Sequence, residues 1–481
     1  MVYGMNLDEN SVRAEEKGMV QIVSETNDGS DLNKASSRQY FFQIDVMKFL
    51  CIFMIVSGHT NGGIALPFEF WSYINPVTLF IIIMGFNQGH SFKRQNLHTL
   101  RELYSYQYFK KIFWRFLFPI ILINIFCVLF DLLIYNMTSV HISGWSLEQW
   151  NFVSWGPTNI PDAIYEPANP YYLLLGMPFF PGPGSYFVTL ILGFAIIFPL
   201  IYKLFDKNPI LGLLSCYIIE FCFQIIADFI PYGGLHYLFD GCIIRFLSAI
   251  GLGVWFIYGH DIFAKRNLFV ILLFPLSIFL TLCSHNAFIG GIFPPSFFEN
   301  FSFIFERAPL SPAPYNYGLR FFRLYPYWQN VNLFVFFYPA LQFLIFMKVL
   351  PSKLNKNKKI SQKTQKSVRV MSKLTYHILL VQIVYFFIQI PLSTANWDYF
   401  MIDDTLFNAI LDPIISGVDM NMLTADIYLG LFIAKSFFYF INFVIVVALA
   451  LSFYLVESGI RKGFKKMGHM MIKNKEDKKF G

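Results

Sequence analysis

Charged residues are scarce in this sequence. They make up 14% of its 481 residues, while 56% of the residues are hydrophobic and 19% aromatic. A soluble domain carries about 25% charged residues, so an ordinary soluble fold is excluded. The apolar residues form continuous runs of about 20, the length of a membrane-spanning helix, and lack the alternating runs of about 10 that build a membrane β-barrel. The sequence therefore predicts an all-α fold, a polytopic membrane helical bundle of about ten transmembrane helices.

Several catalytic motifs are also missing. The chain has no Walker A motif, no GxSxG elbow, no HExxH and no CxxC, which argues against P-loop, α/β-hydrolase, zincin and thiol-redox chemistry. Its six cysteines all fall inside predicted spans. We expect them to be small packing residues rather than disulfides or metal ligands. No internal repeat is visible, which disfavours a transporter built from inverted repeats.

The apolar runs define ten predicted spans. Their approximate ranges are 41–61, 71–92, 112–135, 185–206, 209–230, 237–259, 267–287, 328–350, 374–395 and 428–456. Residues 1–40 are polar and are predicted to be a flexible cytoplasmic tail. Residues 41–456 then form the membrane domain, and residues 457–481 a basic cytoplasmic tail.

The basic residues indicate the orientation of these spans. Cytoplasmic loops of membrane proteins carry an excess of lysine and arginine. With the N-terminus inside, 31 of the 37 Lys and Arg residues fall in inside segments, three in outside loops and three within spans. We therefore expect a multi-pass protein of the cell (plasma or inner) membrane with both termini in the cytoplasm. The net charge of +7 follows from this distribution, so we expect contact with membrane lipids and no nucleic-acid partner.

Three of the predicted outside segments are long: residues 136–184, 288–327 and 396–427. The first two are rich in aromatic residues, proline and glycine, and the third carries six aspartates. Loops of this length are usually functional or disordered, and their aromatic content argues against disorder. Two interpretations stay open: aromatic faces that stack on sugar rings, or Trp and Tyr residues of an interfacial belt.

The first predicted helix carries three ionisable side chains in an apolar stretch, IDVMKFLCIFMIVSGH, which covers residues 44–59. Asp45 and Lys48 are three residues apart and lie on neighbouring positions of one face. Lys48 and His59 are eleven apart, which places them on the same face with about 16 Å between them along the helix axis. Ionisable residues inside a membrane are costly and indicate function.

Each of these residues has a functional and a structural interpretation. His59 can act as a general base near neutral pH, or can simply hydrogen-bond a neighbouring helix near a helix end. Lys48 needs a partner when it is buried, and Asp45 is one candidate. Alternatively, Lys48 extends its ammonium group to the cytoplasmic interface.

A second group, Lys110, Lys111 and Arg115, lies at the start of the third span and faces the cytoplasm. Such a cluster can hold the phosphates of a nucleotide-bearing donor. The same charges also fit a purely topological role.

Two further sets of polar residues lie within spans. Asn87 and His90 are three residues apart and can face the interior of the bundle, either as ligand contacts or as packing and interhelical hydrogen bonds. In the sixth span, Asp240 and Arg245 are five apart and poorly placed to pair with each other. Glu220 and Asp228 of the fifth span are possible partners. A structural ion pair is favoured over a catalytic role for these residues.

Taken in order, these segments resemble the membrane acyltransferase 3 family, which includes bacterial O-antigen and peptidoglycan O-acetyltransferases. That family opens with L-D-x-x-R and has a histidine eleven residues after the arginine. Here Ile44, Asp45, Lys48 and His59 keep this spacing, with Lys48 in place of arginine. Further similarities are VTLFIIIMGF, KKIFWRFLFP with Arg115, and TYHILLVQ, in which Gln382 stands where a histidine is common.

The resemblance implies transfer of an acyl group, usually acetyl, from cytoplasmic acetyl-CoA to a hydroxyl of a cell-surface or lipid-linked glycan. Acetyl-CoA would be a co-substrate, with no tightly bound cofactor and no metal. His59 would be the general base, while Asp45 and Lys48 organise the donor end of the site. The expected substrate-binding residues are Lys110, Lys111, Arg115, Asn87 and His90.

Two other functions remain open from the sequence. The first is a transporter or flippase for a glycan intermediate, with the intramembrane charges along its path. The second is a membrane homologue that has lost catalysis, for which the replacement of arginine by Lys48 is the motivating feature, because lysine lacks the bidentate fork of arginine.

Overall fold

The computed structural model describes most of the predicted helices and little of the long segments between them. The described residues are 41–59, 75–138, 145–146, 151–152, 186–228, 242–283, 300, 305–307, 317–319, 333–351, 359–386, 389–391, 399–401 and 425–480. The chain divides into two units, Met1–Phe41 and Phe42–Gly481. Everything below concerns the second unit. The predicted cytoplasmic tail at residues 1–40 and the three long outside segments lie almost entirely outside the described residues.

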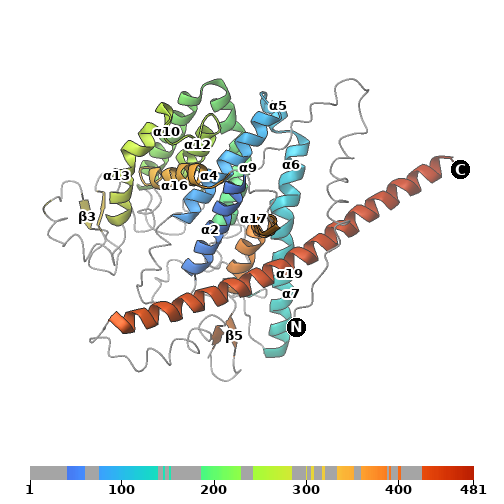
Figure 1. Ribbon diagram of the computed structural model, residues 1–481. Helices are drawn as coiled ribbons and strands as arrows, with labels where there is room; N and C mark the ends of the chain where they lie inside the picture. Colours follow the sequence, from blue (N-terminus) through green and yellow to red (C-terminus); the bar gives the residue numbers. More distant parts are fainter. Residues whose placement is uncertain are drawn as a thin grey trace. The chain divides into compact units, whose positions relative to one another are not determined.

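Helices dominate this unit (Figure 1). The α-helices are α2 Phe42–His59, α4 Pro76–Arg94, α5 Leu100–Leu103, α6 Tyr106–Ile112, α7 Phe118–Thr138, α9 Tyr186–Lys207, α10 Pro209–Asp228, α12 Leu247–Phe256, α13 Leu268–Cys283, α16 Phe337–Val349, α17 Lys359–Tyr385 and α19 Ala425–Phe480. A π-helix, η1 (Phe113–Leu117), joins α6 to α7, and the short 3-10 helices η3 (Ile243–Phe246) and η4 (Lys265–Asn267) precede α12 and α13.

Strands are limited, within the described ranges, to three short antiparallel pairs. They are β1 (Trp145–Ser146) with β2 (Asn151–Phe152), β3 (Phe305–Arg307) with β4 (Tyr317–Leu319), and β5 (Gln389–Pro391) with β6 (Tyr399–Met401). In the longer pairs Glu306 lies opposite Gly318 and Ile390 opposite Phe400. Pairs of two or three residues are too small to form a sheet with its own core.

Four described helical stretches are long and apolar enough to cross a membrane: Leu100–Phe130, Phe187–Lys207, Pro209–Ile226 and Ser436–Phe464. They overlap the predicted spans at 112–135, 185–206, 209–230 and 428–456. Two shorter apolar helices, Ile243–Phe256 and Phe337–Val349, fall in the predicted sixth and eighth spans. The helical character of the chain is therefore confirmed, and four described helices have the length and composition of membrane spans, while the arrangement of ten spans stays a prediction.

Large apolar side chains cover the outer faces of these helices. Exposed examples are Ile125, Phe126, Leu129 and Leu133 on α7, and Ile210, Leu211, Leu214, Ile218 and Ile226 on α10. A soluble protein does not expose apolar faces of this extent, because the contact with water is unfavourable. Lipid chains are the solvent that suits them.

The tightest packing between helices joins α4 to α12. A Cβ atom added at Gly253 would lie 2.3 Å from the carbonyl oxygen of Ile82, and one at Gly85 would lie 2.7 Å from the carbonyl oxygen of Ile250. The two backbones are therefore in direct contact, as in membrane helix pairs built on small residues. Beside this contact the Phe86 and Phe256 rings both pack on Phe343 of α16, with centroid separations of 5.2 and 5.3 Å.

Helix α2 packs against α4, α16, α17 and α19. Its first turn is tied to α16 by Gln43, whose Nε2 donates to the carbonyl of Leu350 at 3.1 Å. Farther along, Phe53 meets Phe443 of α19 edge to face, with ring centroids 5.0 Å apart. The helix that carries Asp45, Lys48 and His59 is thus surrounded by other helices along its length.

Two helices extend beyond the predicted spans. Helix α17 begins at Lys359, fifteen residues before the expected start at 374, because the basic stretch ahead of the span contains lysine, arginine and glutamine and no glycine or proline. Helix α19 continues to Phe480, so the basic segment at 457–481, predicted as a tail, is helical up to that residue. Figure 1 shows α19 as one long helix that passes beside α17.

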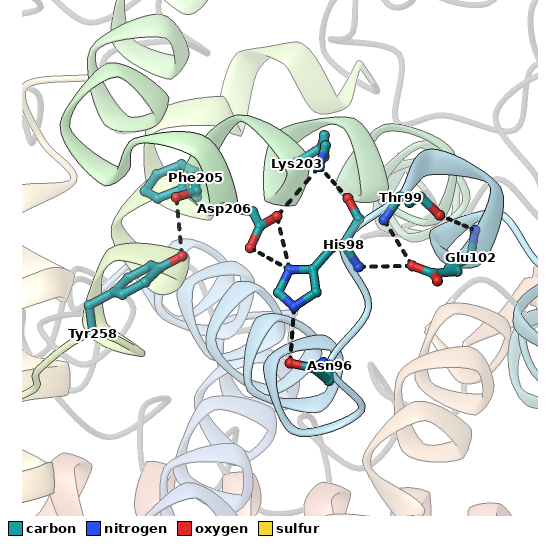
Figure 2. A network of polar contacts seen from close by, with 8 residues as sticks. All are labelled: Asn96, His98, Thr99, Glu102, Lys203, Phe205, Asp206 and Tyr258. Carbon is teal, nitrogen blue, oxygen red and sulfur yellow. Dashed lines mark hydrogen bonds and ion pairs between the residues drawn. The ribbon is translucent and has the colours of Figure 1, made fainter.

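A polar network joins the connection between α4 and α5 to α9 (Figure 2). The Nδ1 atom of His98 lies 3.0 Å from a carboxylate oxygen of Asp206, and its Nε2 lies 2.9 Å from Oδ1 of Asn96. Lys203 donates to the carbonyl of His98 and pairs with Asp206. Thr99 and Glu102 form a capping box that starts α5. These contacts fix the chain that leads into α6 and the basic cluster that follows.

Candidate functional site

Asp45 lies in the first turn of α2, and its carboxylate is tied to α17. The side chain is buried, and Oδ1 accepts a hydrogen bond of 2.5 Å from the hydroxyl of Ser372. A charged acceptor at this distance makes a stronger bond than a neutral one. The contact joins residues 327 positions apart, so it sets how α2 and α17 lie against each other at this level.

Lys48 follows one helical turn after Asp45 and is partly buried. Two charges act on its ammonium group: the carboxylate of Asp45 attracts it, and the guanidinium of Arg115 repels it. The structure thus brings together three of the residues singled out in the sequence, from two helices. With two cations and one anion, this group carries a net positive charge that an anionic ligand would balance.

Arg115 owes its position to the π-helix η1. A π-helical turn contains one more residue than an α-helical turn, which breaks the regular hydrogen-bond ladder and frees backbone carbonyls for other partners. Two of these carbonyls are used: that of Phe116 accepts from the Tyr376 hydroxyl at 3.0 Å, and that of Trp114 accepts from Arg461. Tyr376 lies on α17 and Arg461 on α19. Both helices therefore hold the turn that carries Arg115.

Lys110 and Lys111 lie on α6, in the last turn before η1, and are exposed. Arg115 is exposed as well, and its guanidinium lies 5.2 Å from the centre of the Phe116 ring. The Lys110 ammonium lies 5.9 Å from the Tyr106 ring. The three cations are thus exposed on α6 and η1, and the charge of one of them, Arg115, acts on Lys48.

His59 is the last residue of α2. Its side chain lies outside the described residues, so the structure positions only the end of the helix that carries it. Asp45 and Lys48 are near the opposite end, and the eleven residues from Lys48 to His59 correspond to a rise of about 16 Å.

Asn87 and His90 are partly buried on α4. The charges acting on His90 come from Arg94, Lys93 and His260. The His90 and His260 rings both lie beside Phe86, with centroids 6.0 and 6.1 Å away. Partial burial lowers the pKa of His260, which lies in the connection after α12, so the neutral imidazole is favoured there.

A buried charged group that the sequence interpretation did not single out joins α17 to α19. The carboxylate of Glu457, with a side chain only 2% exposed, contacts both His377 Nε2 and the guanidinium of Arg461. The spacing of Glu457 and Arg461, four residues apart on one helix, is a recognisable signal of an ion pair. Their partner His377 is 80 residues away, and no local pattern indicates that contact.

Gln382 is a further residue whose unusual surroundings are seen only in the structure. It lies on α17 and is fully buried, and neither its Oε1 nor its Nε2 has a hydrogen-bond partner. The family resemblance places Gln382 where a histidine is common, but gives no indication of its surroundings. A buried amide with both polar atoms unsatisfied is rare in folded proteins and calls for an explanation.

In the fifth and sixth spans, where the sequence predicts a structural ion pair, the structure shows a buried group of hydrogen bonds around Glu220. Glu220 and Arg245 are both buried, and each acts electrostatically on the other. Glu220 also accepts from the backbone N–H of Ser248 at 2.7 Å, from its hydroxyl at 2.5 Å, and from Gln224 at 3.0 Å. Because three hydrogen bonds hold this buried carboxylate, we interpret Glu220 as a structural residue. Asp240, the other ionisable residue of the predicted sixth span, lies outside the described residues.

Of the cysteines whose side chains the structure describes, five are free: Cys51, Cys127, Cys216, Cys222 and Cys242. The first three are buried, as a packing role requires, whereas Cys222 is exposed and Cys242 half-buried. Among the residues that the structure describes, no three His, Cys, Asp or Glu side chains are grouped so as to hold a metal ion.

Comparison with known proteins adds no relative to this picture. No family model, no curated protein and no solved structure matches the sequence.

Proposed function

We propose that this protein is an integral membrane O-acyltransferase that moves an acetyl or other acyl group from cytoplasmic acyl-CoA to a hydroxyl of a cell-surface or lipid-linked glycan. The observation that carries the proposal is that the charges of Asp45 and Arg115 both act on Lys48, in the first turns of α2. Two further exposed cations, Lys110 and Lys111, lie on the helix before Arg115, and a histidine ends α2.

The chemistry assigns one role to each end of α2. At the basic end, Arg115, Lys110 and Lys111 hold the phosphates of CoA, for which cationic side chains are suited. Asp45, fixed by Ser372, keeps Lys48 in place. The pantetheine arm then extends along α2 toward His59, over a rise of about 16 Å.

At the other end, His59 acts as general base on the acceptor hydroxyl. The hydroxyl oxygen attacks the thioester carbonyl while its proton moves to the imidazole. The carbon–sulfur bond then breaks, the new ester forms, and the CoA sulfur takes the proton back from His59. The reaction needs no metal, oxidant or reductant, and no net proton is released.

Replacing His59 with alanine should lower acyl transfer by about 100-fold or more, the contribution of a general base. The measurement is transfer of label from radiolabelled acetyl-CoA by the purified protein, with membrane glycan as acceptor. His98→Gln is the matched control, because His98 belongs to the separate network beside α9 and its replacement should leave the rate within about two-fold. Full activity of His59→Ala rules out this role for His59.

The wild-type protein distinguishes the two alternative functions. A wild-type protein that binds acetyl-CoA but never transfers acetyl is a degenerate homologue, and one that moves a glycan across a vesicle membrane without acetyl-CoA is a transporter.

Substitution of Lys48 by arginine tests the donor end of the site. If Lys48 has the role of the arginine in the family's L-D-x-x-R pattern, Lys48→Arg should keep or raise kcat/KM for acetyl-CoA, because the arginine side chain can make two parallel hydrogen bonds to a phosphate. Lys48→Met, which removes the charge, should raise the KM for acetyl-CoA by about ten-fold or more. Equal KM values for both variants and the wild type contradict a donor-binding role.

A further inference from the structure

Gln382 has no hydrogen-bond partner although it is fully buried. Both Oε1 and Nε2 lack a partner, and burying an unsatisfied polar group costs about 1–3 kcal/mol. The buried Gln224 differs, since its Nε2 donates to Glu220 at 3.0 Å. Within the part of the chain that the structure describes, Gln382 is the glutamine in which both amide atoms are left in this state.

The position of Gln382 along α17 follows from contacts on either side of it. Ser372, ten residues earlier, bonds Asp45 at the start of α2. Tyr385, three residues later, donates at 2.6 Å to Asn442 of α19, whose neighbour Phe443 packs on Phe49 and Phe53 of α2. Helices α2 and α17 therefore run in the same direction. Gln382 lies beyond the basic group at Lys48, on the way toward the end of α2.

The side chain also belongs to the face of α17 that carries Ser372. The positions 372, 375, 379 and 382 follow one another at spacings of three, four and three, which keeps them on one side of a helix. Thr375, Leu379 and Gln382 are all buried. About 15 Å of helix rise separates Ser372 from Gln382, a length comparable with the distance from Lys48 to His59.

From this placement we propose that Gln382 binds an amide of the pantetheine arm of acyl-CoA. The inference rests on the proposed function. Each of the two amides in pantetheine offers one N–H donor and one C=O acceptor, and a glutamine side chain offers the complementary pair. The arm of a donor that extends from phosphates at Lys48 and Arg115 toward His59 passes the level of Gln382. A bound donor thus satisfies the two atoms that the free protein leaves without partners.

The test compares binding of two ligands to the purified full-length protein by isothermal titration. CoA contains the pantetheine arm, whereas adenosine 3′,5′-bisphosphate carries phosphates and lacks it. Gln382→Leu should weaken CoA binding by about ten-fold or more, because hydrogen bonds to the arm are lost, and should leave the affinity for the bisphosphate unchanged. Gln382→His, which keeps one donor and one acceptor in the neutral ring, should recover a substantial part of the CoA affinity.

Gln224→Leu is the matched control, since it also removes a buried glutamine but one that already has an internal partner. It should leave the ratio of the two affinities as in the wild type. Equal CoA affinity of Gln382→Leu and the wild type overturns the inference and leaves the proposed function standing, as does an effect of Gln382→Leu confined to the KM for the glycan acceptor. Equal loss of both ligands also overturns it, because it indicates a structural role. Failure of the wild type to bind CoA at all overturns the proposed function itself.

Discussion

Replacing Gly253 with alanine is expected to disrupt the packing of α4 against α12 and to lower the stability of the folded protein by about 3 kcal/mol or more. The new Cβ would lie 2.3 Å from the Ile82 carbonyl oxygen, 2.9 Å from the Phe86 nitrogen and 3.1 Å from the Gly85 Cα. All three are backbone atoms, so no side-chain rotation relieves the contact. The two helices must separate, and the packing between them is lost.

The expected loss of stability in Gly253→Ala is opposite in sign to the usual effect of replacing glycine with alanine in a helix. In an exposed helix interior, glycine to alanine stabilises by about 1 kcal/mol, because alanine loses less backbone entropy on folding. Gly459 on α19 offers the matched control, since nothing lies within 4 Å of a Cβ added there. Thermal unfolding in detergent should show Gly253→Ala well below the wild type and Gly459→Ala equal to it or above it. Equal shifts in the two variants contradict the close contact of α4 with α12.

Replacing Glu220 with leucine should cost about 3–5 kcal/mol, because three buried hydrogen-bond donors lose their acceptor, at about 1–3 kcal/mol each. The substitution leaves three donors in an apolar environment: the N–H and hydroxyl of Ser248 and the amide of Gln224. It also removes a carboxylate whose charge interacts with that of the buried Arg245. Chemical denaturation of the detergent-solubilised protein measures the loss.

Glu220→Gln provides the control, because it keeps the shape and one acceptor oxygen. Its loss of stability should be smaller than that of Glu220→Leu. A double variant that combines Glu220→Leu with Ser248→Ala gives a second control. Its loss of stability should be smaller than the sum of the losses in the two single variants, since the Ser248 hydroxyl and the Glu220 carboxylate share one hydrogen bond. Strict additivity of the two losses, or a Glu220→Leu variant as stable as the wild type, contradicts a structural role for this carboxylate.

The helices that the sequence predicted best are those with continuous apolar runs. The starts of α9 and α10, at Tyr186 and Pro209, agree within a residue with the predicted spans at 185–206 and 209–230. Hydrophobicity along the chain suffices there, because a membrane requires an apolar segment of about 20 residues whatever its neighbours are. The extent of α17 and α19 was underestimated, because their basic ends are helical without being apolar.

The candidate site was only partly predictable. Asp45, Lys48 and Arg115 stand out in the sequence because ionisable groups are rare in apolar helices. The bond from Ser372 to Asp45, the carbonyls freed by η1, and the grouping of His377, Glu457 and Arg461 were not predicted. Ser372 and His377 have no unusual local pattern, and the π-helical register of residues 113–117 leaves no distinct mark in their composition.

By itself, the sequence determined that this chain is built from apolar helices suited to a membrane, and that its first helix carries an aspartate, a lysine and a histidine at helical spacing. Those properties depend on residues near one another in the chain. Only the tertiary structure decided that Asp45 meets Ser372 from 327 positions away and that Gln382 is buried without a partner. Such contacts depend on how each helix is rotated and shifted against its neighbours, which the packing of side chains across the interface determines.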